Sequence, residues 1–181
     1  TLLQALRHVK SPIYLTIRCQ GERLMSWIES VLEEIVKTSQ ADVLLEGEVS
    51  YEQLFADHDV YVAPERFNGL SLPLQEARAA GLLVLTTDRY PTNTWLPKFK
   101  GSFSEMKLRT TMFPVKTYQR ARTQPSNLEF DEAVVEPEAV AAVMDSWFSA
   151  EIEEYSLQGK VWAEENSWSA LKEKWMAAIC E

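Results

Sequence analysis

The chain has 181 residues, which is enough for one domain with a sizeable core but too few for two domains of usual size. Its hydrophobic fraction of 46% is ordinary for a globular protein, and no apolar run is long enough to cross a bilayer. The formal net charge of −9 argues against nucleic acid as the main partner. We therefore expect a single domain over residues 1–181.

The first half of the chain alternates helical and strand patterns with short connections. The expected order is a helix, a strand, a long amphipathic helix and a second strand, at residues 2–9, 13–17, 22–38 and 43–47. Ser50 is expected to cap a short helix through Phe55, with Gln53 at the capping-box position.

The most informative segment lies between two short apolar runs, at residues 60–63 and 82–86, that are typical of strands buried in a parallel sheet. Between them, Gly69 marks a turn, Ser71 and Pro73 are placed to start a helix, and Gly81 ends it. This order predicts an α/β fold, a Rossmann-like and mainly parallel sheet flanked by helices. It also leaves free backbone N–H groups at the carboxyl edge of the sheet, which suits a phosphate.

Beyond Pro97 the patterns are weaker. Residues 113–118 are expected to form an edge strand, and residues 123–135 a loop. Three C-terminal helices are expected at residues 137–148, 157–166 and 167–179, the last capped by Ser167. These helices carry four tryptophans that are interpreted as core residues, with sugar stacking as the alternative: Trp147, Trp162, Trp168 and Trp175.

The sequence contains few residues that could bind a metal, form disulfides or act as a catalytic nucleophile. Cys19 and Cys180 lie near opposite ends in apolar contexts, which predicts a reduced, cytoplasmic protein. His8 and His58 are the two histidines, and both are expected to be structural, so neither a metal site nor a cofactor is predicted. No catalytic Ser/His/Asp pattern, GxGxxG motif or P-loop is present.

The segment from Pro64 to Gly81 resembles the donor-binding signature of the retaining GT-B glycosyltransferases (group 1). In that family a Glu-Gly-Phe-Gly-Leu segment precedes a second Glu, eight positions after the first, and then a helix of small residues. Glu76 matches the second Glu, whereas Asn68 replaces the first Glu and Ser71 replaces a Gly. The resemblance is close from Val43 to Pro97 and loose over most of the remaining chain.

The resemblance implies a domain that binds a UDP- or GDP-linked sugar. Glu76 would hold the ribose hydroxyls with two carboxylate oxygens, and Asn68 would keep hydrogen bonding to the sugar without the charge of a Glu. Both are assigned as catalytic-site residues. Backbone groups would meet the diphosphate and the base, in two stretches: Gly69, Leu70, Ser71 and Leu72 for the diphosphate, and Gly47, Glu48 and Val49 for the base. For the base stretch, an ordinary strand-ending turn is the alternative.

Several basic residues are candidates for contact with phosphate. Arg18, at the end of a strand, and Arg66, beside the signature, are assigned to the donor site, with a surface ion pair as the alternative for each. A basic stripe runs from Lys98 to Arg122, through Lys100, Lys107, Arg109, Lys116 and Arg120. It is interpreted as a solvated face, or as a contact for donor phosphates or the acceptor.

The resemblance covers the C-terminal half of a GT-B enzyme. The basic loop that clamps the diphosphate and the N-terminal acceptor domain of that family lie outside this chain, which begins with Thr1 rather than Met. We therefore expect this chain to be a piece of a longer protein, inactive by itself. Two other hypotheses are a non-catalytic binding or structural module that retains the fold, and another doubly wound nucleotide-binding enzyme such as an epimerase.

Overall fold

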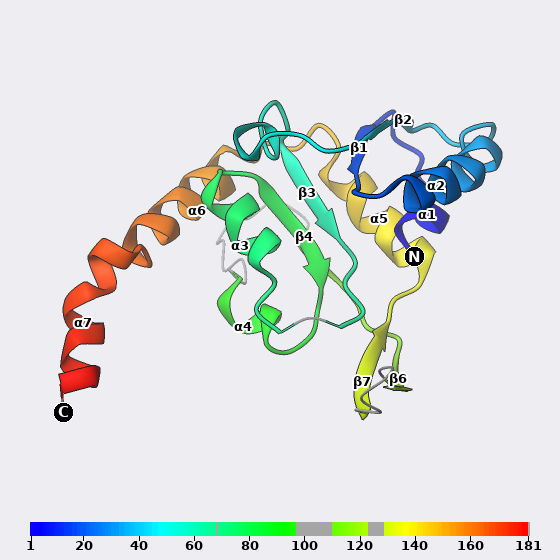
Figure 1. The fold of residues 1–181 in the computed structure, drawn as a ribbon. Coiled ribbons are helices and arrows are strands. Elements are labelled where there is room, and N and C mark those ends of the chain that lie inside the picture. The colour runs from blue at the N-terminus through cyan, green and yellow to red at the C-terminus, as the bar shows by residue number, and fades with distance from the viewer. Residues whose placement is uncertain (68, 97–109, 123–128, 181) are drawn as a thin grey trace, which may run out of the picture.

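The computed structural model describes residues 1–67, 69–96, 110–122 and 129–180 (Figure 1). Its N-terminal half contains α1 (Leu2–Ala5), β1 (Tyr14–Arg18), α2 (Glu22–Ile35), β2 (Asp42–Glu46), the 3-10 helix η1 (Tyr51–Gln53), β3 (Val60–Ala63), α3 (Leu72–Ala79), β4 (Leu83–Thr87) and α4 (Thr92–Trp95). The C-terminal half contains β5 (Met112–Phe113), β6 (Thr117–Arg122), β7 (Glu129–Val134), α5 (Pro137–Trp147), α6 (Glu153–Glu165) and α7 (Trp168–Cys180). The α/β class and the order of elements predicted through β4 are confirmed, whereas α4 was not predicted.

The strands form two parallel sheets and one antiparallel hairpin. β1 pairs with β2, and β3 pairs with β4, which pairs with β5; all of these pairs are parallel. Every residue of β4 is buried, because helices cover both faces of this strand. Leu83 and Leu85 face α5, and Val84 faces α3.

A third apolar cluster joins α1 and α2 to the β1–β2 sheet. The amphipathic face of α2 buries Ile28, Leu32 and Ile35 there, and Leu6 joins them from the turn after α1. No helix in the described part of the chain is long and apolar enough to cross a membrane.

β1 and β3 face each other across an open slot of about 650 Å³. The residues around it come from the amino-terminal ends of both strands, such as Tyr14 and Val60, and from the end of α5. Within the described residues, no strand pairs with the slot-facing edge of β1 or of β3.

Two predictions for residues 113–135 are wrong. The expected edge strand is split into β5 and β6, and part of the expected loop, residues 129–134, is strand β7. β6 and β7 pair along their full length, and ion pairs link Arg120 to Asp131 and Arg122 to Glu129. β6 is mostly exposed and both strands are rich in charge, so they lack the run of alternating large apolar residues that marks a strand in a sequence.

The interpretation of the four tryptophans as core residues is correct only in part. Trp147 is buried against Tyr155, and Trp162 is half-buried under the guanidinium of Arg78. Trp168 and Trp175 are 82% and 51% exposed, because α7 extends away from the rest of the molecule (Figure 1). The three C-terminal helices are confirmed, although α6 begins four residues earlier than predicted, at Glu153.

Candidate functional site

The predicted site residues follow the carboxyl ends of parallel strands. This is the edge at which open α/β sheets bind ligands, because the loops there carry free backbone groups. Arg18 ends β1, Gly47 follows β2, and the segment from Pro64 to Ser71 follows β3. The structure thus presents two groups of candidates, one on each parallel sheet.

The loop after β3 is closed by hydrogen bonds of its own. The hydroxyl of Ser71 donates to Oε1 of Glu65 at 2.6 Å, and the side-chain amide of Gln75 donates to the carbonyl of Leu70 at 2.7 Å. Ser71 is buried and adopts a left-handed backbone with φ of 47°, a region that only a few per cent of non-glycine residues occupy. The family Gly at this position fits that conformation without strain.

Glu65 is a residue that sequence reasoning missed. It lies in the signature segment, but the sequence patterns predicted no role for it. The available signal was a carboxylate six positions before a serine at a predicted helix start, a pair that can meet only if the chain between them turns back. Its contact with Ser71 shapes the loop rather than facing a ligand.

The start of α3 offers backbone donors to the solvent side. The amides of Leu74 and Gln75 already donate to the carbonyl of Ser71, and Pro73 has no N–H. The first helical residue, Leu72, has no acceptor within the helix, as at any helix start. Leu70 and Leu72 are 69% and 62% exposed, so this loop faces outward.

Glu76 is half-buried on α3, whose residues Leu74 and Ala77 lie against the sheet. Within the described residues, its carboxylate makes no hydrogen bond or ion pair, in contrast to Glu65. The carboxylate lies close enough to Tyr61 to act on it: burial, then Glu65, then Glu76 raise the pKa of the Tyr61 hydroxyl. A half-buried carboxylate with unused acceptors is suited to binding a hydroxylated ligand.

The group on the other sheet is organised by Arg18. Its Nε donates to Oε2 of Glu46 at 2.8 Å, and its Nη1 donates to the carbonyl of Leu54. Gly47 lies next to this pair, and a Cβ atom there would meet the Met25 side chain at ordinary contact distances, 3.8 Å to the sulfur and 4.0 Å to the terminal carbon. Glu48 is exposed and Val49 half-buried in the turn that follows.

Arg66 pairs with Glu132 of β7, Nη2 to Oε2 at 2.8 Å. Both arginines of the predicted site therefore make the ion pair that was the alternative to a ligand role. Arg66 is still 54% exposed.

The remaining predicted residues are Asn68 and those of the basic stripe. Asn68, Lys98, Lys100, Lys107 and Arg109 lie outside the described residues. From the basic stripe, Lys116 pairs with Glu136, and Arg120 and Arg122 pair with acidic residues of β7. Within the described residues, no group of His, Cys, Asp or Glu side chains could hold a metal ion.

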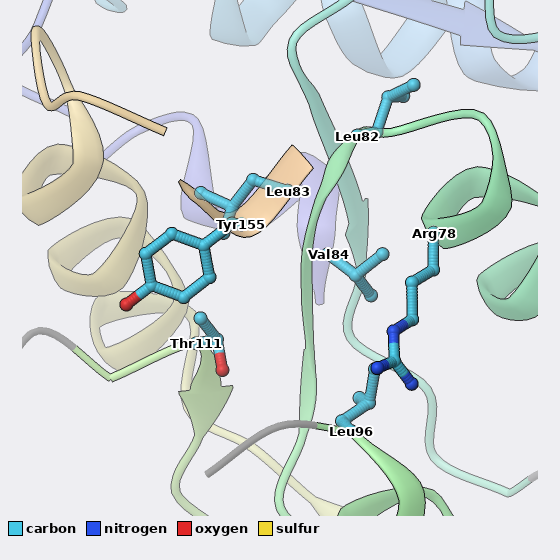
Figure 2. Close-up of a pocket in the computed structure, with 7 residues that line it drawn as sticks. All are labelled: Arg78, Leu82, Leu83, Val84, Leu96, Thr111 and Tyr155. Carbon is cyan, nitrogen blue, oxygen red and sulfur yellow. The ribbon is translucent and has the colours of Figure 1, made fainter. Parts of the chain in front are cut away.

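A second, smaller cavity lies beside β4 and has a volume of about 20 Å³, room for about one water molecule (Figure 2). Arg78 and Leu96 line it from one side of the strand, and Thr111 and Tyr155 from the other. Burial lowers the pKa of Arg78 to about 10. Neither this cavity nor the slot between β1 and β3 contains Glu76 or the loop before α3.

Comparison with known proteins gives one match. A family model described as "Glycosyl transferases group 1" matches residues 1–95, more than half of the 181 residues. The matched region contains both groups of site residues and ends at α4. Searches among curated proteins and solved structures found no significant match.

Proposed function

Because the chain belongs to the glycosyl transferases of group 1, we propose that it binds a UDP- or GDP-linked sugar for transfer of the sugar to an acceptor. The observation that carries this proposal is the half-buried carboxylate of Glu76, which has no partner among the described residues. It lies on α3, whose first residue, Leu72, is exposed and has no acceptor for its N–H within the helix.

Each part of the nucleotide sugar has a suitable partner. The two oxygens of Glu76 accept hydrogen bonds from the vicinal ribose hydroxyls. The backbone of Gly69–Leu72 donates to the diphosphate, helped by the dipole of α3. The backbone of Gly47–Val49 lies beside the base, and Asn68 bonds the sugar. Arg18 and Arg66 add positive charge near the phosphates while they remain paired to Glu46 and Glu132.

The chemistry proposed for this domain is stabilisation of the leaving group. The departing diphosphate gains charge as the bond to the sugar breaks, and fixed N–H dipoles stabilise that charge better in a closed, dry site than in water. None of the proposed site residues is placed as a general base. Retention of anomeric configuration follows from the family assignment.

We also propose that the chain is one half of a larger enzyme and is inactive alone. The slot between β1 and β3 supports this, because each of these strands is an edge strand that lacks a neighbour on the slot side among the described strands. One more parallel strand would join the two sheets into one. The reading frame upstream of Thr1 tests the proposal, and it fails if no apolar strand is encoded there.

The rival function is a non-catalytic module that retains the family fold. Asn68 in place of an acidic residue favours it, and so do the ion pairs that occupy Arg18 and Arg66. Such a module would bind neither UDP nor GDP.

Isothermal titration calorimetry with UDP, GDP and their sugars separates these functions. Glu76→Gln should weaken nucleotide binding about 10- to 100-fold, the equivalent of losing a charged hydrogen bond pair of about 1.5–3 kcal/mol. Removing the 2′-hydroxyl from the nucleotide should weaken its binding to the native chain by a similar factor. It should weaken binding to Glu76→Gln little further, because both changes remove the same contact.

Glu164→Gln on α6 is the matched control, since it removes one exposed carboxylate away from the site. Equal affinities for the native chain and Glu76→Gln would refute the ribose role. No binding by a folded chain that includes the upstream segment would favour the non-catalytic module.

A further inference from the structure

The β6–β7 hairpin contacts the loop that precedes the proposed diphosphate site. It belongs to neither parallel sheet, and Figure 1 shows it projecting from the body beside the carboxyl end of β4. β6 is mostly exposed, whereas β7 is mostly half-buried and its Ala133 is fully buried. One hydrogen bond, one ion pair and one ring contact link its strands to two residues of the loop after β3, Arg66 and Phe67.

Three contacts join β7 to those two residues. The backbone amide of Ala133 donates to the carbonyl of Arg66 at 2.7 Å. The carboxylate of Glu132 accepts from the guanidinium of Arg66 at 2.8 Å. The ring of Phe130 lies on the ring of Phe67, with centroids 4.1 Å apart and planes tilted by 39°.

Arg89, in the turn after β4, holds the same two residues from another direction. Its Nη1 donates to the carbonyl of Arg66 at 2.9 Å, so this carbonyl has two donors. Its guanidinium carbon lies 5.4 Å from the centroid of the Phe67 ring, within the range of a cation–π contact. Phe67 is thus held between Phe130 and Arg89 while remaining 54% exposed.

We propose that the hairpin is a clasp that positions the donor loop, with Phe130 and Glu132 as positioning residues. The donor loop, residues 69–72, begins two residues after Phe67. Leu70 and Leu72 are exposed, so few apolar contacts fix this loop. The contacts from β7 and Arg89 fix the backbone and side chains of Arg66 and Phe67, just ahead of this loop. The backbone of Gly69–Leu72 is thereby held in position for the phosphates, so less conformational entropy is lost on binding. This role rests on the proposed function.

The clasp is tested by hydrogen exchange and calorimetry on the same variants of the full chain. Phe130→Ala should speed exchange of the peptide spanning residues 64–72 at least tenfold and weaken UDP or GDP binding about tenfold. Glu132→Gln should act in the same direction with a smaller effect. Phe130→Tyr keeps the ring and should restore both values.

Tyr118→Ala and Arg120→Gln are the matched controls. Tyr118 is an exposed aromatic residue of the same hairpin, and Arg120 pairs only within the hairpin among the described residues. Neither change removes a contact of Arg66 or Phe67, so neither should change exchange at residues 64–72 or nucleotide affinity.

Unchanged exchange at residues 64–72 in Phe130→Ala would overturn the clasp, even if the hairpin itself had unfolded. Unchanged affinity with faster exchange would also overturn it, since the loop would then need no positioning. If the native chain binds no nucleotide, the proposed function fails, and with it the positioning role, while exchange still reports whether the hairpin orders the loop.

Discussion

The hydroxyl of Ser71 donates to Oε1 of Glu65 at 2.6 Å, and this contact closes the loop that leads into α3. It holds Ser71 in a left-handed backbone at the helix start, where a glycine stands in the family. The hydrogen bond therefore stabilises a conformation that the backbone of Ser71 disfavours. The loop retains its shape through a side-chain contact instead of through glycine.

Ser71→Ala should lower the free energy of unfolding by about 1.5–3 kcal/mol, because a hydrogen bond to a carboxylate is lost and the strained backbone remains. Ser71→Gly loses the same bond but relieves the left-handed strain, so it should cost less than Ser71→Ala. Urea denaturation of the three chains measures the order. A larger loss in the glycine variant would contradict this account.

The pKa of Tyr61 reports on the Glu76 carboxylate. Burial raises this pKa above 10, and the negative charges of Glu65 and Glu76 raise it further. Glu76→Gln should therefore lower it, as followed by ultraviolet absorbance of tyrosinate against a Tyr61→Phe blank. Glu164→Gln should leave the titration unchanged, and an unchanged value in Glu76→Gln would show that the carboxylate lies away from the ring.

The same shift predicts how stability depends on pH. Because the folded-state pKa of Tyr61 is the higher one, its contribution is fully present below pH 10, the unfolded value, and is lost as the pH rises toward the folded value. Tyr61→Phe should remove that part of the alkaline loss. Urea midpoints measured on both sides of pH 10 provide the test.

Gly159 of α6 lies where α6 crosses α3. A Cβ atom there would lie 2.4 Å from the backbone carbonyl oxygen of Arg78, which no rotamer change can move away. Gly159→Ala should destabilise the fold by about 1–3 kcal/mol, in spite of the better helix propensity of Ala. Gly69→Ala meets nothing within 4 Å and is the control for stability. A thermal midpoint equal to that of the native chain would show that α6 moves aside.

Substitution of a buried tryptophan should lower the free energy of unfolding more than substitution of an exposed one. Trp147 is 6% exposed, and its Nε1 donates to the carbonyl of Thr110 at 2.9 Å, whereas Trp168 is 82% exposed. Trp147→Phe should cost about 1–3 kcal/mol, because the carbonyl loses its donor and a cavity opens. Trp168→Phe should stay within about 0.5 kcal/mol. Chemical denaturation followed by circular dichroism gives both values.

Local sequence patterns predicted the elements that bury apolar residues. The run of Leu83 to Leu85 predicted a buried strand, because a strand of a parallel sheet is covered on both faces and is therefore continuously apolar. The helix of residues 22–35 was visible because its apolar face repeats with helical spacing. The hairpin was missed, since its strands are stabilised by pairing with each other and by cross-strand ion pairs, such as that of Arg120 and Asp131, rather than by an apolar face.

For this protein, the sequence by itself determined the α/β class, the order of elements through β4, and the family resemblance around Glu76. These depend on periodicity, caps and spacing, which are local properties of a chain. Only the tertiary structure decided that Arg18 and Arg66 are paired, that Glu65 holds Ser71, and that β7 clasps Phe67. Such contacts join residues whose partners are fixed by how the elements dock, and no local pattern encodes that docking.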